Sequence, residues 1–357
     1  MPVPRRPLAV TADAALLDEL LRLAATAGVE LEVADDAGAA RRSWTSAPVV
    51  LVGDDLCPAV CRARLPRRPG VVLAATLSSH EDVWEWGVRI GAEHVALLPE
   101  ADRWLIDRLA DATESVGHEA AVVAVLGGRG GAGATPLAAA LAVGASRAGR
   151  QVLLVDGDPL GGGIDLVFGG EQDRGLRWPE LTSTRGRLPA QALSSALPQM
   201  AGLAVLSWDR GESAPAPAEA VQAVLTAGRR AHDLVVVDLP RSLDEGARAA
   251  LALATTVLLV VPTEVRAAAA AARVAASAGL LCSDLRLVTR GPSPSGLNGE
   301  QVARALGLPL FGELRPEPGL DVALERGEPP GRRARSPLAQ LCGRLLDELL
   351  PAVHRVA

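Results

Sequence analysis

The residues best suited to chemistry form a glycine-rich segment at 127–136, which an apolar run precedes and a run of alanine and leucine follows. The first run is typical of a buried strand and the second of a helix. Glycines let successive backbone N–H groups converge on an anion, and the start of a helix adds partial positive charge. The segment therefore predicts a loop that binds phosphate groups.

The spacing of the loop fits the Walker A pattern of nucleotide-binding proteins, but the lysine of that pattern is missing. Gly128, Gly133 and Thr135 occupy their expected positions, and the Thr135 hydroxyl would bind Mg²⁺. Ala134 stands where the lysine would bridge the β- and γ-phosphates. Arginine fills all 36 lysine-or-arginine positions, so no lysine elsewhere can replace it. We therefore expect weak nucleotide binding and little or no hydrolysis.

Three aspartates follow apolar runs that are typical of buried strands. Asp156 and Asp158 come directly after residues 152–155, and Asp238 ends the run that starts at Leu234. In open α/β sheets, ligands bind at the carboxyl ends of the strands. Carboxylates at this edge therefore suit a nucleotide site.

In this order the motifs resemble those of the MinD/ParA family of P-loop ATPases, over residues 120–350. The family's deviant Walker A reads Gly-Lys-Gly-Gly-x-Gly-Lys-Thr-Thr, which residues 128–136 match with Arg129 at the first lysine and Ala134 at the second. The family also has the Asp-x-Asp found at 156–158. The further matches are Ile164-Asp165 and the segments 233–240, 256–264 and 308–317.

The resemblance implies binding of ATP or ADP with Mg²⁺ and a role for each matched residue. Asp158 would position the attacking water, and Arg129 would replace the signature lysine, which reaches the partner's nucleotide in a dimer. The metal would be held by Thr135, Asp156 and Asp238. The nucleotide would contact Gly128, Arg129, Gly130, Gly131, Ala132, Gly133, Ala134, Thr135, Pro136 and Pro316.

Two departures from the family pattern affect the expected site. Pro136 replaces the final threonine of the loop and removes one N–H that could meet a phosphate oxygen. The strand expected at 285–289 is followed by Arg290, where the family often has asparagine. Recognition of adenine therefore lacks the residue that the resemblance would supply.

Within residues 1–112, short apolar runs alternate with amphipathic helical patterns, which predicts a parallel doubly wound sheet. Strands are expected at 8–11, 29–33, 49–52, 71–75 and 94–98, and helices at 14–27, 81–91 and 102–112. This order resembles the flavodoxin-like receiver domain of response regulators. We expect an α/β protein with a receiver-like domain at 1–112, a linker at 113–120, and a P-loop domain with a doubly wound, mostly parallel sheet at 121–357.

The residues that a receiver needs for phosphorylation are degenerate. A working receiver has an acidic pair after the first strand, a phosphorylatable Asp after the third and a Lys after the fifth. Asp13 matches the acidic pair weakly, Asp54 or Asp55 stands near the acceptor position, and Leu98 occupies the lysine position. Without that cation a phosphoryl group lacks a charge-assisted partner. We therefore expect a protein-contact module that is not phosphorylated.

Composition and charge argue against several other classes of function. A net charge of −6 offers no general attraction to nucleic acid, and no apolar run reaches the roughly 18 residues of a membrane span. The four cysteines lack metal-ligand spacing and are expected to be reduced thiols of a cytoplasmic protein. The helix expected at 337–350 carries Asp347 and Glu348, so we expect it to pack on the core and not on a membrane.

The expected function is that of a MinD/ParA-like regulator that determines the septum site or positions pilus or secretion machinery at a pole. The sequence Asp-Leu-Pro-Arg at 238–241 is similar to the CpaE branch of the family, which also has an N-terminal receiver-like domain. Its partners would be proteins of those machineries, together with a nucleotide-dependent homodimer. Two alternatives stay open: a slow Mg²⁺-dependent ATPase in which Arg129 replaces the loop lysines, and a phosphorylatable response regulator.

Overall fold

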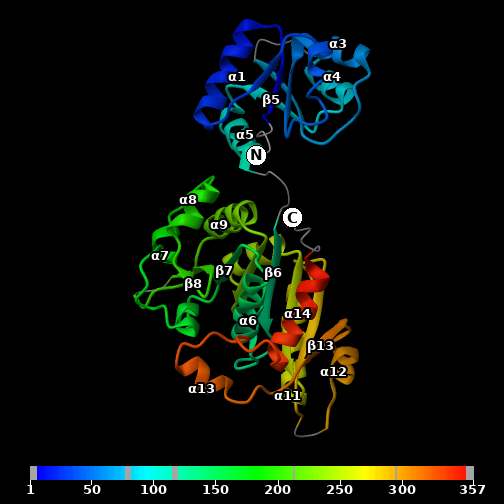
Figure 1. The fold of residues 1–357 in the computed structure, drawn as a ribbon. Coiled ribbons are helices and arrows are strands. Elements are labelled where there is room, and N and C mark those ends of the chain that lie inside the picture. The colour runs from blue at the N-terminus through cyan, green and yellow to red at the C-terminus, as the bar shows by residue number, and fades with distance from the viewer. Residues whose placement is uncertain (1–5, 77–81, 115–119, 212–213, 294–295, 351–357) are drawn as a thin grey trace. The chain divides into compact units, whose positions relative to one another are not determined.

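The computed structural model describes residues 6–76, 82–114, 120–211, 214–293 and 296–350. The chain divides into two compact units, Met1–His118 and Glu119–Ala357. Both are α/β units, and each has its own sheet (Figure 1). The linker expected at 113–120 lies largely outside the described residues.

The first unit is a five-stranded parallel sheet of order β2-β1-β3-β4-β5. This order is that of flavodoxin-like folds, as the receiver resemblance predicts. Helices α1 and α5 pack on one face of the sheet, and α2, α3 and α4 on the other. The strands are β1 Leu8–Val10, β2 Glu32–Ala34, β3 Val50–Gly53, β4 Val71–Thr76 and β5 His94–Leu98. The helices are α1 Ala14–Thr26, α2 Ala37–Ala40, η1 Asp54–Leu56, α3 Cys57–Ala63, α4 Val83–Ile90 and α5 Asp102–Glu114.

The second unit is an eight-stranded sheet of order β13-β12-β11-β6-β10-β7-β9-β8, in which only β8 is antiparallel to its neighbour. Its strands are β6 Ala121–Gly127, β7 Val152–Asp156, β8 Gln199–Met200, β9 Leu203–Leu206, β10 Leu234–Leu239, β11 Thr256–Pro262, β12 Leu285–Arg290 and β13 Leu310–Leu314. Its helices are α6 Ala134–Arg147, η2 Ile164–Phe168, α7 Trp178–Leu181, α8 Ala190–Ala196, α9 Ala218–Ala231, α10 Glu245–Leu253, α11 Val265–Ala278, α12 Gly299–Leu306, α13 Leu320–Glu325 and α14 Pro337–Leu349.

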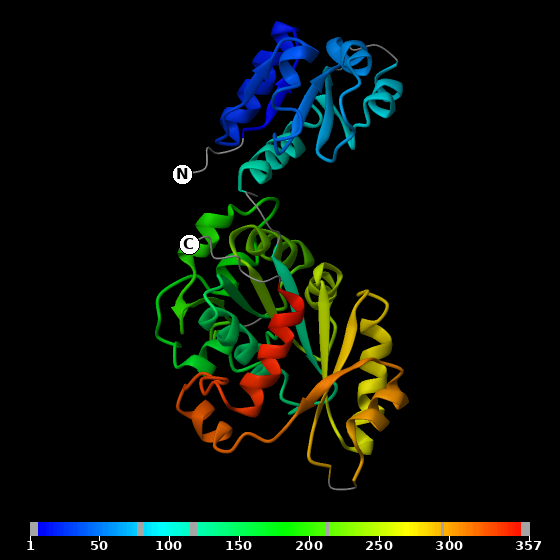
Figure 2. The ribbon, with the colours of Figure 1, turned by 45° about the vertical axis from the view of Figure 1, so that its right-hand side comes forward.

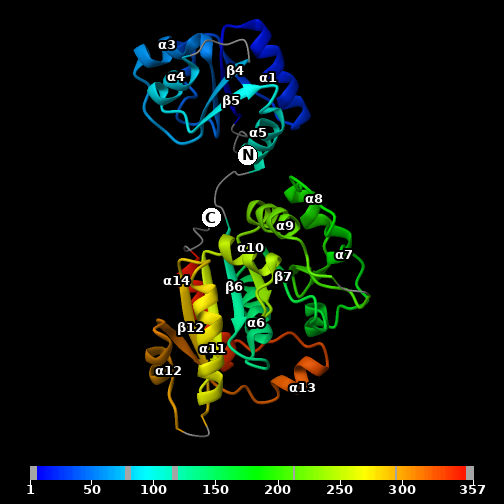
Figure 3. The ribbon, with the colours of Figure 1, turned by 180° about the vertical axis from the view of Figure 1, so that it is seen from behind.

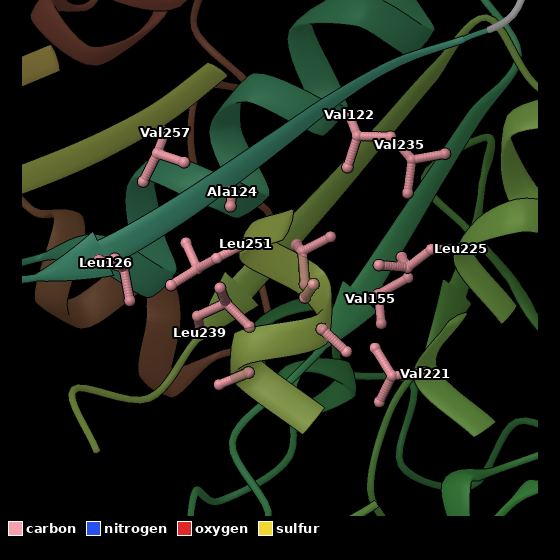
Figure 4. Packing of buried hydrophobic residues seen from close by; sticks show 14 of the residues in the cluster. Val122, Ala124, Leu126, Val155, Val221, Leu225, Val235, Leu239, Leu251 and Val257 are labelled. Carbon is pink, nitrogen blue, oxygen red and sulfur yellow. The ribbon is translucent and has the colours of Figure 1, made fainter. Parts of the chain in front are cut away.

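Alternation along the central strand β6 separates its side chains onto two buried faces. Val122, Ala124 and Leu126 pack toward α9, α10 and α11, which lie in front in Figure 3. Val123 and Val125 pack toward α6. Because both faces are covered, the central strands are apolar until they reach the carboxyl edge of the sheet. Figure 4 shows the first face around Val122, Ala124, Leu126, Val155, Val235 and Val257.

Helix α14 lies along α6 on the second face of the sheet (Figure 2). Leu338, Leu341, Cys342 and Leu345 recur at helical spacing and are buried in the same cluster as α6. The apolar side of α14 is thus used for packing within the unit. Among the described residues, no helix combines the length and the apolar character that crossing a bilayer requires.

Several boundaries differ from the sequence-based expectation, and two of these differences have a clear physical reason. Strand β2 begins at Glu32 and not at Val29, because the Val29 N–H donates to Ala24 O at 2.9 Å and closes helix α1. Helix α6 begins at Ala134 and not at residue 137, because Gly133 already provides the left-handed residue that precedes it. Helix α5 continues to Glu114. Strands β8 and β9 and helix α9 were not expected from the sequence.

Candidate functional site

Glycines shape the loop between β6 and α6. Gly128 passes so close to the β11–α11 region that an added Cβ would lie 2.7 Å from the Ala271 Cβ and 2.9 Å from Val261 Cγ2. Gly131 and Gly133 have φ values of +69° and +98°, which favour glycine. No side chain caps the start of α6. Its first N–H groups are therefore directed at the loop and can bind an anion.

Asp156 and Asp238 lie side by side at the carboxyl edge of the sheet, since they are register partners on β7 and β10. Leu154 and Val236, two positions earlier on these strands, pack toward α6, so both aspartates face the first turn of that helix. The Thr135 side chain lies next to the Asp238 carboxyl and lowers its pKa. The structure thus brings together the three residues that the sequence assigns to magnesium.

Both carboxylates at this edge of the sheet are buried, and burial disfavours their ionised forms. Asp156 is 3% exposed and Asp238 5% exposed. Burial raises the pKa of Asp156 to about 6, against the hydrogen bonds from the backbone that lower it. Burial raises the pKa of Asp238 to about 7, and the neighbouring Thr135 side chain opposes this shift. A divalent cation would favour the ionised forms of both groups.

Magnesium fits this donor set. The described part of the chain contains no cluster of three or more His, Cys, Asp or Glu side chains that could hold a metal by themselves. Mg²⁺ commonly uses one or two carboxylates, keeps several waters and completes its shell with phosphate oxygens. Asp238 and the Thr135 hydroxyl, with Asp156 next to them, are suited to that kind of site.

Asp156 also shapes the segment that follows β7. Its Oδ1 accepts from the Asp158 N–H at 3.1 Å, and its Oδ2 from the Ile164 N–H at 2.8 Å. The Trp178 indole donates to the Asp156 carbonyl at 2.5 Å. The Asp158 side chain accepts from the Leu160 N–H at 3.0 Å. Asp158, the expected positioning residue for water, therefore lies in the turn that Asp156 holds.

Asp165, the second member of the Ile-Asp match, is fully buried and bound by two arginines. Arg210 donates to both of its oxygens, at 2.8 and 2.7 Å, and an Arg177 nitrogen lies 3.4 Å from Oδ2. A buried carboxylate needs such partners, and here they connect η2 with the segment before α7 and the segment after β9. Sequence reasoning missed both arginines, because nothing distinguishes them from the many others.

Arg129, expected to replace the loop lysines, is held by its own chain. Its Nη2 donates at 2.8 Å to Oε1 of Glu264, which lies in the connection between β11 and α11. Both side chains are partly exposed. The family resemblance covers Glu264 within the segment 256–264 but implies no role for it.

Arg290 reaches the loop from the end of β12. Its Nη1 donates to the Gly131 carbonyl at 3.0 Å. A Cβ built at Gly133 would lie 3.4 Å from the same nitrogen. Ala134 and Pro136 are partly buried in the first turn of α6, as the helix start requires.

Pro316 lies between β13 and α13, beside a cavity of about 400 Å³. The cavity is lined by residues 317–320, Ala323 and residues 328–333, and Pro316 is not part of its lining. Glu317, which is, accepts from the Leu338 N–H at 3.3 Å and so connects this segment to α14. A contact between Pro316 and a nucleotide stays a prediction.

Backbone N–H groups of the first unit already engage the carboxylates of Asp13 and Asp55. Asp55 accepts from the Thr11 hydroxyl at 2.9 Å and from the N–H groups of Ala12 at 2.7 Å and Asp13 at 3.1 Å. Asp13 in turn caps α1. The lysine position of a receiver holds Leu98, which is buried. These contacts stabilise the edge of the sheet without a cation.

Two family models match consecutive parts of the chain. The Rv3660c-like, CheY-like N-terminal domain matches residues 10–120, and the cellulose biosynthesis protein BcsQ matches residues 120–289. The Rv3660c protein of Mycobacterium tuberculosis (strain ATCC 25618 / H37Rv) is 42% identical over 341 residues, which are 94% of this chain and 96% of that protein. A putative septum site-determining protein MinD of Nephroselmis olivacea is 26% identical over 58% of this chain and 78% of that protein.

Solved structures agree with this assignment at the level of the fold. A ParA family ATPase of Chlorobium tepidum TLS has a TM-score of 0.55 and 17% identity, over 63% of this chain and 98% of that one. The MinD cell division protein of Aquifex aeolicus has a TM-score of 0.53 and 24% identity, over 65% and 99%. The chain therefore belongs to the family of Rv3660c, in which a CheY-like domain precedes a domain of the MinD/ParA type.

Proposed function

We propose that this protein is a MinD/ParA-type regulator that binds ATP or ADP with Mg²⁺ and hydrolyses ATP slowly or not at all. The observation that carries the proposal is the contact between Thr135 and Asp238 beside a loop with alanine at 134. The residues that would hold a metal lie near one another, whereas the lysine charge that would stabilise a transferring phosphoryl group is missing from the loop. Such a site favours binding over turnover.

Different residues of the second unit would bind the phosphate groups and the magnesium ion. The N–H groups of the loop and of the first turn of α6 would bind phosphate oxygens. Thr135 and Asp238 would hold magnesium, which neutralises phosphate charge when it is bound. Asp156 would keep the turn that contains Asp158 at the edge of the site. Arg129 would contribute little, because Glu264 holds it.

The relatives support a role in placing other proteins. The MinD proteins of Nephroselmis olivacea and Synechocystis are named as septum site-determining proteins. The structure of MinD from Aquifex aeolicus has been solved in complex with MinC. We infer that this chain likewise acts through protein partners and a nucleotide-dependent homodimer, from the cytoplasm at the septum or at a pole with pilus or secretion machinery. Its CheY-like unit would serve as the docking module, since the Asp55 carboxylate is engaged by its own backbone.

Calorimetric titration with Mg-ATP and Mg-ADP tests the binding, and a phosphate-release assay tests turnover. We expect the parent protein to bind both nucleotides and to release phosphate more slowly than Ala134→Lys, which restores the loop cation. Asp238→Asn is the control, because it should lose the Mg²⁺-dependent part of binding. Turnover by the parent equal to that of Ala134→Lys, at every protein concentration tried, would contradict the proposal.

Localisation tests the cellular role separately. A fluorescent fusion of the full chain should gather at the septum or at a pole, and the same fusion with Asp238→Asn should stay diffuse. A parent fusion that is diffuse throughout the division cycle would sink the positioning role, whatever the nucleotide assays show.

A further inference from the structure

We propose that Arg290 supplies the positive charge that the phosphate loop lacks at position 134. This inference rests on the nucleotide binding proposed above. It concerns an arginine that is distant in sequence from the loop and lies on a different strand, where the sequence showed only a missing asparagine.

The register of the sheet places Arg290 at the carboxyl edge. It is the last residue of β12 and pairs with Pro262, the last residue of β11. Val288, two positions before it, packs in the cluster on the α6 side of the sheet. Alternation therefore directs the Arg290 side chain to the side on which α6 begins.

The side chain reaches the loop itself. Nη1 of Arg290 donates to the Gly131 carbonyl at 3.0 Å and lies beside Gly133, the residue that precedes α6. The guanidinium is thus placed within the segment whose backbone N–H groups would meet phosphate. Strand β11, which lies between β12 and β6, does not prevent this approach, because Arg290 extends past the strand ends.

The chemistry of this contact leaves the charge available. A carbonyl oxygen is neutral, so the hydrogen bond to Gly131 does not neutralise the guanidinium. Arginine has five N–H donors in a planar fork that suits phosphate oxygens. Arg129 differs, since its bond at 2.8 Å is with the Glu264 carboxylate. Of these two arginines, Arg290 is the better source of the missing charge.

Three variants separate charge from shape in a titration with Mg-ATP, Mg-ADP and adenosine. Arg290→Gln keeps a side-chain donor for the Gly131 carbonyl but removes the charge, whereas Arg290→Lys keeps the charge. We expect Arg290→Gln and Arg290→Ala to lose about tenfold or more in affinity for both nucleotides, as for the loss of a charge-assisted contact. Arg290→Lys should stay close to the parent, and adenosine binding should not change.

A double mutant and a charge control complete the test. In an Ala134→Lys background, Arg290→Gln should cost less affinity than in the parent, because the two cations serve the same phosphates. Arg304→Gln, an exposed residue of α12, removes the same charge elsewhere on this unit and should have no effect.

Each other result counts against the inference. If Arg290→Gln binds nucleotide like the parent while Arg290→Ala does not, Arg290 only shapes the loop. If Arg304→Gln weakens binding equally, the effect is one of net charge. If the parent binds no nucleotide, the proposed function fails and the inference fails with it, whereas normal binding by Arg290→Gln overturns the inference alone.

Discussion

The two units of this protein carry aspartates at the same place, the carboxyl ends of parallel strands, and use them differently. In the first unit, Asp55 is exposed and accepts hydrogen bonds from two backbone N–H groups and a threonine hydroxyl. In the second unit, Asp238 is buried, its pKa is raised to about 7, and the Thr135 side chain lies next to it. The first carboxylate is satisfied by its own fold, and the second is suited to a cation.

The difference shows that position in a fold does not define a site. Both units are doubly wound, and both would be expected to bind ligands at this edge. What separates them is the environment of each carboxylate: its burial and the number of N–H groups that it accepts. Asp165 is a third case, because it is buried but has arginines built in as partners.

The largest expected effect is on folding, at the buried aspartate that is already paired. Asp165→Asn keeps the size of the side chain and removes the charge that Arg177 and Arg210 contact. The free energy of unfolding should fall by about 3 kcal/mol, because a partner charge is left buried. Urea unfolding measures it, with the exposed Glu171→Gln as control. A loss no larger than that of Glu171→Gln would show that the cluster is not a structural one.

The next effect is on binding, and it compares the two units directly. Asp238→Asn should weaken Mg-ADP binding by roughly 100-fold, as expected when a metal ligand is lost. Asp55→Asn in the first unit should leave it unchanged. Equal losses in the two variants, measured by calorimetry, would mean that the environments of these carboxylates do not distinguish a site from a structural contact.

An effect of similar size is expected in the pH dependence of the free energy of unfolding, measured without metal and nucleotide. Because the folded state raises the pKa of Asp238 from 3.8 to about 7, it holds the proton more tightly than the unfolded chain does. The stability that this provides is complete below about pH 4, declines as the pH rises from 4 to 7, and is gone above about pH 7. Asp238→Asn does not titrate, so its stability relative to the parent should increase over this range, by an amount on the order of a few kcal/mol.

Urea unfolding at pH 5, 6.5 and 8 in the presence of a chelator measures the difference. Asp55→Asn serves again as the matched variant of the first unit. If the free energies of unfolding of Asp238→Asn and the parent differ by the same amount at all three pH values, the pKa of Asp238 is not raised in the folded state.

The smallest effect is expected in the first unit. Asp55→Asn should lower its free energy of unfolding by about 1 kcal/mol, because an amide accepts less strongly than a carboxylate from the N–H groups of Ala12 and Asp13. Incubation with acetyl phosphate should add no phosphoryl group to Asp54 or Asp55, as intact-mass spectrometry would show. A labelled protein would establish the response-regulator alternative instead.

The sequence predicted most of the fold, because the buried strands are long apolar runs. Runs such as those at 121–126 and 234–238 leave little choice once both faces of a sheet are covered. The short strands β2 and β8 were misplaced or missed, since few residues carry their pattern. Val29 shows the reason: its apolar side chain suits a strand, but its N–H is used by the end of α1.

The candidate site was predicted in part. Asp156 and Asp238 were expected at the carboxyl edge of the sheet because each follows or ends an apolar strand, and Thr135 was assigned to the same metal by the resemblance; the structure pairs the two aspartates and places Thr135 in the first turn of α6. Glu264 and Arg290 gave no such signal. Their contacts depend on how far a long side chain extends across neighbouring strands, which no local pattern records.

The packing of α14 on α6 has a consequence for how the protein is made. Helix α6, which begins in the phosphate loop, leaves the ribosome about 190 residues before the helix that covers it. At the usual speed of translation, this delay is roughly 10 to 40 seconds. Until then the outer side of α6 is exposed on the nascent chain, so this helix is among the last parts of the unit to reach its final surroundings.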